Sequence, residues 1–375
     1  LKPYSKISES DFDKKIGLSG SRGEVINFLI RVKIKECTDI NLADVSPHLL
    51  NVRFYELLPF ETKKPSYRGA PIGTHWDPLI QKNNFCPTSH QSQLWILGEF
   101  EIAAEAKPGL ISGTLLLKNT KIPLELKVWK MQMPDYPSLP LYAELTTWYM
   151  LLGHYGKWHE GEATLAQKYV QKMIEHKIYP IKHWIKPIID QNGSIVLNNN
   201  SSSQNKDSFL DAVVKPLPEQ ALISIPFPND ASIENFKNYF KKVHQKLKEA
   251  QLLERSFVYL WDEPAKNEFP LLKQRAEVIR TVAPGLKILV TTPWQKSLEH
   301  LVDIFVPVMD QYEGRKGSWL YVSCMSHGCG NSSSSGTPDW VIDRDSPYIR
   351  SQAWIAHHFQ TPALLYYSIN NGYIS

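Results

Sequence analysis

Short alternating runs of apolar and polar residues dominate the first third of the chain. Between about Val25 and Trp129 the pattern repeats in the runs VINFLIRVKI, LNVRFYELL, SQLWILGEFEI and GTLLLKNTKIPLELKVWKM, with Pro, Gly and Asn between them. Apolar residues at every second position are typical of half-buried antiparallel strands, because successive side chains of a strand point to opposite faces. No long helical pattern interrupts these runs. The sequence therefore predicts an N-terminal antiparallel β-sandwich over residues 1–133.

The pattern changes after the segment MQMPDYPSLP, whose prolines predict a stiff linker over residues 134–140. Beyond the linker, apolar runs alternate with long amphipathic segments. Eight strands are predicted, at 141–148, 178–185, 221–227, 257–264, 287–292, 304–312, 319–324 and 363–370. Helices are predicted at 160–176, 232–251, 268–282 and 346–359. Eight strands alternating with helices predict a (β/α)8 TIM-like barrel over residues 141–375.

The predicted barrel has irregular features. A polar, Asn/Ser-rich segment at 198–206 is too hydrophilic to pack, and it is predicted to be an inserted loop. The helix expected after the eighth strand has no room before Ser375, so we expect either a longer parent protein or an irregularly capped barrel. The chain begins at Leu1 without a signal sequence, and a secreted, periplasmic or cell-surface location is therefore only an inference.

Composition narrows the class of partner. With 42 Lys and Arg against 38 Asp and Glu, the net charge is +4, and the chain lacks the basic blocks of nucleic-acid-binding proteins. No apolar run of about 18 residues predicts a membrane span. The 11 Trp and 17 Tyr residues are compatible with a carbohydrate cleft, because flat aromatic faces stack on sugar rings. Composition therefore disfavours nucleic acid as a partner and is compatible with a glycan or glycoconjugate substrate without showing one, and we expect no cofactor.

Four cysteines, Cys37, Cys86, Cys324 and Cys329, allow three pairings if all are oxidised. Because no CxxC spacing occurs, a zinc ribbon and a thioredoxin-type site are disfavoured. Cys324 and Cys329 flank His327 in the segment CMSHGCG, which leaves a loop disulfide, free thiols and a metal site as interpretations. The disulfide ranks first and the metal site last.

The strongest candidate for chemistry is the run FVYLWDEP, in which Asp262, Glu263 and Pro264 follow Trp261. In parallel barrels catalytic residues lie at the carboxyl ends of the strands. Two neighbouring carboxylates resist joint ionisation, so we expect one acid and one anion. Pro264 is predicted to hold Glu263 extended where the chain leaves the sheet, so that both side chains turn toward a common ligand. The alternative is that one of the two carboxylates caps the helix starting near Ala265.

Other strand ends supply further candidates for substrate contact. Tyr hydroxyls and Asn amides hold substrate oxygens, and Trp forms a wall for sugar subsites. The candidates are Trp261, Asp310, Tyr312, Asn370, Asn371, His183, Trp184, Glu144 and Trp148. The sequence contains no GxSxG, HExxH, Walker lysine loop or GxGxxG motif, which disfavours a serine hydrolase, a zincin, a P-loop protein and a Rossmann protein.

Several motifs together resemble glycoside hydrolase family 123 and the related uncharacterised domains grouped with it. The likeness rests on the linker KVWKMQMPDYPSLP, on YLWDEP, VDIFVPVMDQY and SCMSHGCGN, and on a Trp-containing helix before LLYYSINNGY. The segment HWDPLI at 75–80 also resembles a Pro-Asp-Pro-Leu type segment in the sandwich of that group. The resemblance runs from about Trp76 to the end of the chain. This sequence departs from the pattern at Tyr367, a candidate substrate contact that stands where relatives often have Trp.

The resemblance implies a retaining exo-β-N-acetylhexosaminidase, with N-acetylgalactosamine as the favoured sugar. Characterised members of the family use no protein nucleophile, because the substrate's own 2-acetamido oxygen attacks the anomeric carbon and an oxazoline forms. Carried over to this chain, the resemblance makes Glu263 the general acid/base, protonated at the start, and Asp262 the carboxylate that orients the acetamido N–H. By its place at the end of the sixth predicted strand, Tyr312 is the candidate donor to the acetamido carbonyl.

Two alternatives remain beside this hypothesis. In the first, an ordinary retaining glycosidase uses Glu263 as the acid and another strand-end carboxylate such as Asp310 as the nucleophile. In the second, the barrel has lost activity, and the chain is a carbohydrate-binding or scaffold protein. Substrates that lack the 2-acetamido group separate the first alternative from the family mechanism. Binding without turnover, unchanged by Glu263→Gln, would favour the second.

Overall fold

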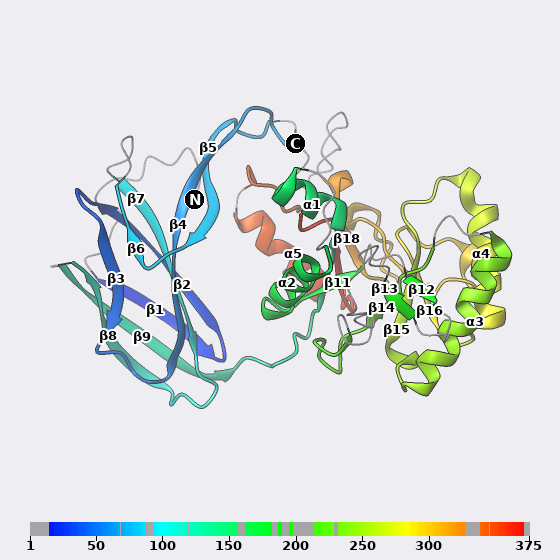
Figure 1. Ribbon diagram of the computed structural model, residues 1–375, viewed down its shortest axis with the longest axis horizontal. Helices are drawn as coiled ribbons and strands as arrows, with labels where there is room; N and C mark the ends of the chain where they lie inside the picture. The colour runs from blue at the N-terminus through cyan, green and yellow to red at the C-terminus, as the bar shows by residue number, and fades with distance from the viewer. Residues whose placement is uncertain are drawn as a thin grey trace. The chain divides into compact units, whose positions relative to one another are not determined.

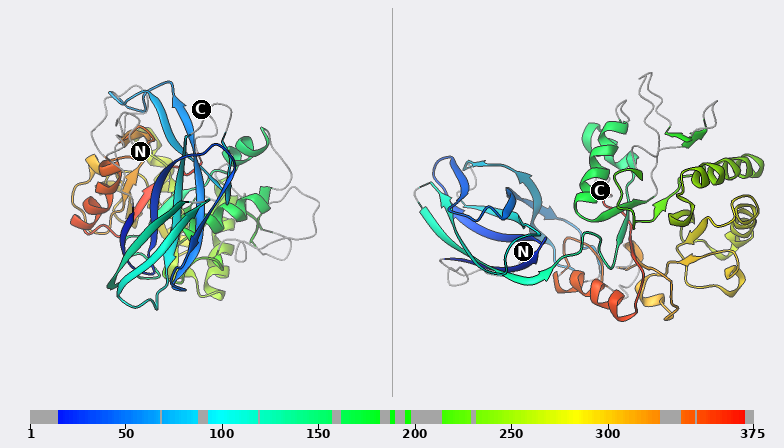
Figure 2. Two further views of the ribbon diagram at one scale, coloured as in Figure 1. Left: turned by 90° about the vertical axis from the view of Figure 1, so that its left-hand side faces the viewer. Right: turned by 90° about the horizontal axis from the view of Figure 1, so that it is seen from below.

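The computed structural model divides the chain into two compact units (Figures 1 and 2), each described by itself. The first unit comprises Leu1–Asp135 and Val341–Asp345, and the second comprises Tyr136–Trp340 and Ser346–Ser375. The structure describes residues 15–67, 69–87, 93–118, 120–156, 162–181, 187–189, 195–197, 214–228, 232–326, 338–344 and 346–370. The predicted insertion at 198–206 lies outside these ranges.

The described part of the first unit consists of strands in two sheets (Figure 1). One sheet has the order β1-β9-β8-β3-β6, and the other has the order β2-β7-β4-β5. Every neighbouring pair is antiparallel except β1 and β9, which run parallel. The strands are β1 (Ile16–Arg22), β2 (Val25–Lys33), β3 (Thr38–Ala43), β4 (Leu49–Thr62), β5 (Gly73–Gln81), β6 (Asn84–Phe85), β7 (Gln93–Ile102), β8 (Gly109–Leu117) and β9 (Thr120–Gln132).

Alternation along these strands places one face of each sheet in a shared apolar core. In β7, for example, Phe100 and Ile102 are fully buried in this core, whereas Glu101 between them is only partly buried. Gly98 of the same strand lies against the ring of Phe28 in β2, and a Cβ atom at Gly98 would come within 2.2 Å of that ring. This position of the ladder therefore requires glycine.

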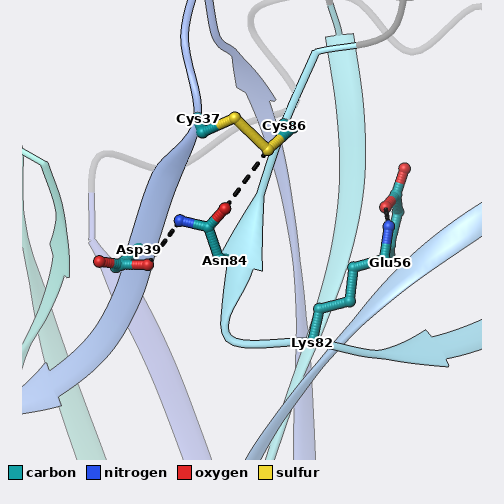
Figure 3. Close-up of a disulfide and its surroundings, with 6 residues drawn as sticks. All are labelled: Cys37, Asp39, Glu56, Lys82, Asn84 and Cys86. Carbon is teal, nitrogen blue, oxygen red and sulfur yellow. Dashed lines mark hydrogen bonds and ion pairs between the residues drawn. A yellow bond between two sulfur atoms is a disulfide. The ribbon is translucent and has the colours of Figure 1, made fainter.

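A disulfide joins the two ends of a long segment in the first unit. Cys37 precedes β3, Cys86 follows β6, and their sulfur atoms are bonded across a sequence separation of 49 residues (Figure 3). Cys324 in the second unit is disulfide-bonded as well. The free-thiol interpretation is therefore wrong for this residue. Cys329 and His327 lie outside the described residues.

A short segment late in the chain belongs to the first unit. Sequence analysis assigned Val341–Asp345 to the barrel, but the structure groups these residues with the N-terminal strands. Asp343 is buried, and its carboxylate accepts a hydrogen bond of 2.8 Å from the Ser66 backbone N–H. The Arg344 guanidinium lies 3.6 Å from the ring centroid of Tyr67. These contacts hold the segment to the loop that follows β4.

The second unit contains a curled parallel sheet (Figure 2). Its strands form two sets of four, β11-β10-β19-β18 and β14-β15-β16-β17, and all of these pairs are parallel. A parallel bridge between Val308 and Tyr321 links the segment after β17 to β18. The strands are β10 (Leu141–Glu144), β11 (Ile178–Ile181), β14 (Ile223–Ser224), β15 (Ser256–Trp261), β16 (Lys287–Val290), β17 (Ile304–Phe305), β18 (Leu320–Val322) and β19 (Leu364–Tyr366).

Because the first strand, β10, pairs with the last, β19, the two ends of the unit meet in one sheet. A separate antiparallel hairpin consists of β12 (Pro187–Ile189) and β13 (Ile195–Leu197). The described residues thus form a mostly β molecule with several sheets and a curled half-barrel of parallel strands. All the catalytic candidates of the described chain belong to this second unit.

Helices connect the strands of the second unit, and α3 and α4 lie beside each other near β15 and β16 (Figure 1). Helix α3 begins where the Ser232 hydroxyl accepts the Asn235 N–H, and it buries an apolar stripe with helical spacing, namely Phe236, Tyr239, Phe240, Val243 and Leu247. The helices are α1 (Thr147–Tyr155), α2 (Glu162–Glu175), α3 (Ile233–Glu249), α4 (Phe269–Val282) and α5 (Ser346–His358). No helix in the described ranges is long and apolar enough to cross a membrane.

The inner face of the curled sheet is aromatic. Its lower layer consists of rings in mutual contact, those of Tyr142, Tyr179, Phe257 and Trp319. Alternate residues of a strand share a face, so the residues two positions farther along these segments form the next layer toward the carboxyl ends. That layer includes Glu144, Tyr259 and Tyr321, all of them buried. A carboxylate and two phenols therefore cover the aromatic layer where the strands end.

The structure differs from the predicted elements at two strand ends. The strand predicted at 141–148 ends at Glu144, and Trp148 lies in helix α1, which ends at Gly156 in a left-handed conformation. An apolar run of this length fits a buried helix as well as a strand, and the glycine C-cap decides between them. The strand predicted at 304–312 shrinks to β17 and a 3₁₀ turn at Met309–Gln311, because Pro307 cannot donate to a ladder.

Candidate active site

Asp262 and Glu263 follow β15 directly at its carboxyl end. The register of β15 against β16 shifts between Tyr259 and Trp261, and Glu263 has a φ of 45°. The extended conformation predicted for Glu263 before Pro264 is therefore wrong. A positive φ costs a residue other than glycine about 1–2 kcal/mol, and such strain is concentrated at functional sites. The register shift and the left-handed residue together re-aim two side chains that regular alternation would send to opposite faces.

Two hydroxyl groups anchor the carboxylate of Asp262. The Tyr259 hydroxyl donates to Asp262 Oδ1 at 2.6 Å, and Thr291 Oγ1, directly after β16, donates to the same oxygen at 3.0 Å. Thr291 Oγ1 also accepts the backbone N–H of Glu263 at 2.7 Å. The Thr291 hydroxyl donates its one hydrogen to Asp262 and accepts the Glu263 N–H with a lone pair. This single hydroxyl therefore links both acidic residues to the neighbouring strand end.

Tyr259 is a neutral donor to this carboxylate. Burial, followed by the charge of Asp262, raises the pKa of Tyr259 well above its usual value. The phenol therefore keeps its single hydrogen, and the shorter contact directs that hydrogen to Asp262 rather than to Thr291, which lies 3.0 Å away. Asp262 and Glu263 are themselves exposed. The buried Tyr259 thus anchors Asp262, while both carboxylates remain accessible to a ligand.

Two further tyrosines lie among the acidic residues of this site. Burial raises the pKa of Tyr321, and the charges of Asp262, Glu263 and Glu144 raise it further. The pKa of Tyr367 is raised to about 12, chiefly by burial, with the charges of Glu144 and Asp262 among the further causes. Both phenols are therefore close to at least two carboxylates and remain protonated donors at neutral pH.

Glu144 closes the opposite side of this group. It is the last residue of β10, it is buried, and its Oε1 accepts a hydrogen bond of 3.2 Å from the Thr146 hydroxyl. The side chain of Asn370 accepts the Thr146 backbone N–H at 3.1 Å and donates to the Thr146 carbonyl at 2.7 Å. Asn370, predicted as a substrate contact, is buried here and ties the end of β10 to the segment after β19.

A cavity of about 170 Å³ lies beside Glu263. Segments at the carboxyl ends of β15, β16, β17 and β18 form its walls, which include Thr291, Thr292, Gln311 and Tyr321 as polar residues. The other walls are mainly apolar, from Pro264, Pro293, Val306, Pro307, Val308 and Met325. The candidate acid/base therefore borders both a polar group of carboxylates and phenols and a mainly apolar hollow.

One other predicted contact, Trp261, interacts away from this group. The ring of Trp261 packs against the core beneath the Arg275 guanidinium of α4, which lies 5.5 Å from the ring centroid. Trp184, with His183, lies outside the described residues, as does Asn371. Over the described ranges, no group of three or more His, Cys, Asp and Glu side chains is placed to hold a metal ion.

Asp310 lies in the 3₁₀ turn that follows β17, and Tyr312 comes directly after this turn. The Tyr312 hydroxyl donates to the Arg315 carbonyl at 3.1 Å, and its ring packs edge-on against Phe359, with 4.9 Å between the centroids. Asp310 is exposed. The structure therefore brings together Asp262, Glu263 and Tyr367 of the predicted site, and it gives Tyr312 other partners.

Sequence reasoning missed three residues of this site: Tyr259, Thr291 and Tyr321. Thr291 carried a usable signal, because the run KILVTT ends in hydroxyl side chains directly after a buried strand. Tyr259 and Tyr321 lie inside apolar strands, where an aromatic residue ordinarily indicates packing. They lie on the inner face, one layer above the aromatic layer, and only the pairing register of the folded sheet shows this.

Neither a model of a known protein family nor a curated protein matches this sequence. Among solved structures, a family 123 glycoside hydrolase from Clostridium perfringens, studied for glycolipid glycan hydrolysis, matches with a TM-score of 0.64 at 11% identity. The match covers 94% of this chain and 74% of that one. A candidate α-galactosidase (melibiase) of Bacteroides fragilis matches with a TM-score of 0.32 at 8% identity, covering 92% of this chain and 78% of that one.

A family 5 xyloglucanase of Bacteroides ovatus matches with a TM-score of 0.22 at 7% identity, covering 95% of this chain and 92% of that one. The scores of these last two structures are too low to carry an argument. The Clostridium perfringens structure is informative about architecture, since one alignment spans nearly the whole of this chain. The chain thus shares its fold with a family 123 glycoside hydrolase.

Proposed function

We propose that this protein is a retaining exo-glycosidase that removes terminal β-linked N-acetylhexosamine, with N-acetylgalactosamine as the favoured sugar, through an oxazoline intermediate. One observation carries the proposal: two consecutive carboxylates at one strand end are held unequally. Asp262 is anchored by two hydroxyl donors, whereas Glu263 borders a cavity. The fold shared with a glycoside hydrolase adds support, although a fold alone does not specify an activity.

Unequal environments suit the division of labour that substrate-assisted hydrolysis requires. Glu263 donates a proton to the glycosidic oxygen as the bond to the leaving group breaks, and it later accepts a proton from the water that opens the oxazoline. Asp262 accepts the acetamido N–H and keeps the amide oxygen directed at the anomeric carbon. Hydrogen bonds from Tyr259 and Thr291 favour the ionised form of Asp262 that this role needs.

The remaining polar groups supply a binding surface for the sugar. The Glu144 carboxylate accepts hydrogen bonds from sugar hydroxyls, and the phenol of Tyr367 donates them. The Tyr312 hydroxyl donates to the Arg315 carbonyl, so we assign it no role at the acetamido carbonyl. With three carboxylates around the site, we expect a neutral terminal sugar rather than a sulfated one or a uronic acid.

We also propose the finer architecture and the location. A shared core between two sheets supports a β-sandwich, and the pairing of β10 with β19 supports a (β/α)8 barrel. The disulfide between Cys37 and Cys86 supports a secreted, periplasmic or cell-surface location, because such bonds persist in oxidising compartments.

The test is a comparison of aryl glycosides that differ in the 2-acetamido group. We expect turnover of an aryl N-acetyl-β-galactosaminide or N-acetyl-β-glucosaminide, no turnover of the aryl β-galactoside, and inhibition by a thiazoline mimic of the oxazoline. Glu263→Gln should lower kcat roughly 10²–10⁴-fold for substrates with poor leaving groups and much less for activated aryl substrates. Asp262→Asn should slow both classes, since each still forms the oxazoline.

The outcomes distinguish this proposal from its alternatives. Turnover of the aryl β-galactoside would contradict the acetamido mechanism and favour a protein nucleophile. Sugar binding without turnover, unaffected by Glu263→Gln, would indicate a binding or scaffold protein. Wild-type rates in both carboxylate variants would remove Asp262 and Glu263 from the chemistry.

A further inference from the structure

We propose that the cavity beside Glu263 is the binding site for the leaving group of the glycoside, and that it selects an apolar group about the size of one aromatic ring. The inference rests on the proposed function, because it takes Glu263 as the general acid. It adds a substrate preference on the side of the scissile bond opposite the terminal sugar.

The position of the cavity assigns it to the leaving group. Its walls include Glu263 and Tyr321 but none of Asp262, Glu144 and Tyr367, which lie on the proposed sugar side. A general acid protonates the glycosidic oxygen, so the atoms beyond that oxygen lie on the side of the acid. The acetamido group, by contrast, must lie against Asp262. A hollow that borders Glu263 without Asp262 therefore faces the leaving group.

The size and chemistry of the cavity define what fits. Its volume of about 170 Å³ is close to the ~150 Å³ of a cavity known to hold benzene. Six of the eleven described residues that line it are proline, valine or methionine, and the others are Glu263, Thr291, Thr292, Gln311 and Tyr321. An anionic group would meet the Glu263 carboxylate, and a strongly polar group would lose hydration against the apolar part of the wall. A phenyl-sized apolar group satisfies both constraints.

The cavity is built into the sheet rather than formed by a surface loop alone. Val306 donates its backbone N–H to the Val290 carbonyl at 3.0 Å, and Val308 forms the parallel bridge with Tyr321. Both valines are buried, so their side chains are fixed before any ligand arrives. Met325 completes the rim, is 37% exposed, and can be changed with little risk to folding.

The experiment measures binding of carbon-linked glycosides, which glycosidases do not cleave, to the intact chain. The two probes are the phenyl and the methyl C-glycoside of whichever N-acetylhexosamine the protein recognises, and calorimetry gives both affinities. We expect the phenyl probe to bind at least tenfold more tightly. Met325→Ala should reduce this ratio about three- to tenfold, near the effect of one missing apolar contact in a hydrophobic pocket.

Matched variants separate a pocket effect from a general one. Met325→Leu keeps an apolar side chain at the rim and should preserve the ratio. Met131→Ala removes the same type of side chain, which is 57% exposed, from β9 in the first unit and should change neither affinity. A third probe, the methyl C-glycoside with an N-butanoyl group, tests whether the cavity instead receives the acyl chain.

Each possible result bears on either the inference or the proposed function. Equal affinities for the phenyl and methyl probes would overturn the inference and leave the proposed function standing. Tighter binding of the N-butanoyl probe that is lost in Met325→Ala would also overturn it, because the cavity would then belong to the sugar. Failure of both C-glycosides to bind, together with no turnover of any aryl glycoside, would refute the proposed function itself.

Discussion

Replacing Thr291 by valine tests whether one hydroxyl organises both acidic residues. The two side chains have nearly the same volume, and Thr291 is buried, so Thr291→Val removes a hydroxyl without leaving a cavity. The change deletes the donor at 3.0 Å from Asp262 and the acceptor at 2.7 Å from the Glu263 N–H. Thr291→Ser keeps both interactions and is the matched control.

The expected loss of stability follows from these two bonds. An exposed Asp262 recovers part of its lost bond from water, and the part-buried Glu263 N–H loses its acceptor, where a fully buried group would cost about 1–3 kcal/mol. We therefore expect Thr291→Val to lower the free energy of unfolding by about 2 kcal/mol. In a unit of this size each kcal/mol moves Tm by about 2–4 °C, which gives a fall of roughly 4–8 °C.

Activity should fall further than stability alone explains. Misplacement of a catalytic group by about 1 Å costs on the order of 10²-fold, so kcat/KM of Thr291→Val for an aryl N-acetylhexosaminide should drop about 10–100-fold. Thr291→Ser should stay within about threefold of wild type. Thermal unfolding followed by circular dichroism and steady-state kinetics give the two readouts. If valine and serine behave alike in both assays, Thr291 does not organise the pair.

Three other changes have directions fixed by the structure. Glu263→Gly should slow turnover of substrates with poor leaving groups, as Glu263→Gln does, yet raise the free energy of unfolding by about 0.5–1 kcal/mol, because glycine accepts the φ of 45°, whereas Glu263→Ala should give no such gain; denaturant titration compares them. Folding raises the pKa of Tyr367 and Tyr179 from the ordinary 10.0 to about 12, so the stability they contribute is complete below pH 10 and lost as pH rises through 12. Denaturant titrations at increasing pH should show that decline, and a flat profile would contradict it. Reduction of the bond between Cys37 and Cys86, which closes a loop of 49 residues, should destabilise the first unit by about 2–4 kcal/mol, whereas the first unit of a Cys37→Ser/Cys86→Ser variant should not respond to reductant, because the other disulfide-bonded residue, Cys324, lies in the second unit.

The sequence predicted the place of the acid pair better than its geometry. An apolar run that ends in two acids locates Asp262 and Glu263 at a strand end, because burial of the run and exposure of the charges leave little choice. The left-handed conformation of Glu263 is different, since local preferences before proline oppose it. Contacts from another strand, including the one between Thr291 and the Glu263 N–H, accompany this conformation and are not encoded in the run itself.

The same limit explains the tyrosines. A buried strand tyrosine has one of two possible faces, and only the register of the whole curled sheet places Tyr259 and Tyr321 inside, above the aromatic layer. Tyr312 looked equivalent because it follows an apolar run, yet its hydroxyl bonds to the Arg315 carbonyl. The hydrophobic pattern therefore predicted where each tyrosine lies along its strand. It did not predict which residues of other strands each tyrosine contacts, because those contacts depend on the tertiary structure.

The late return of residues 341–345 to the first unit has a consequence for how this molecule can be divided. The polypeptide passes from one unit to the other three times, after Asp135, after Trp340 and after Asp345. A protease that cuts the proline-rich linker separates the N-terminal strands from residues 341–345, and a fragment ending at Asp135 lacks the Asp343 carboxylate that accepts the Ser66 N–H. Recombination at the linker would likewise transfer the N-terminal strands without residues 341–345. The two units therefore cannot be exchanged as independent domains.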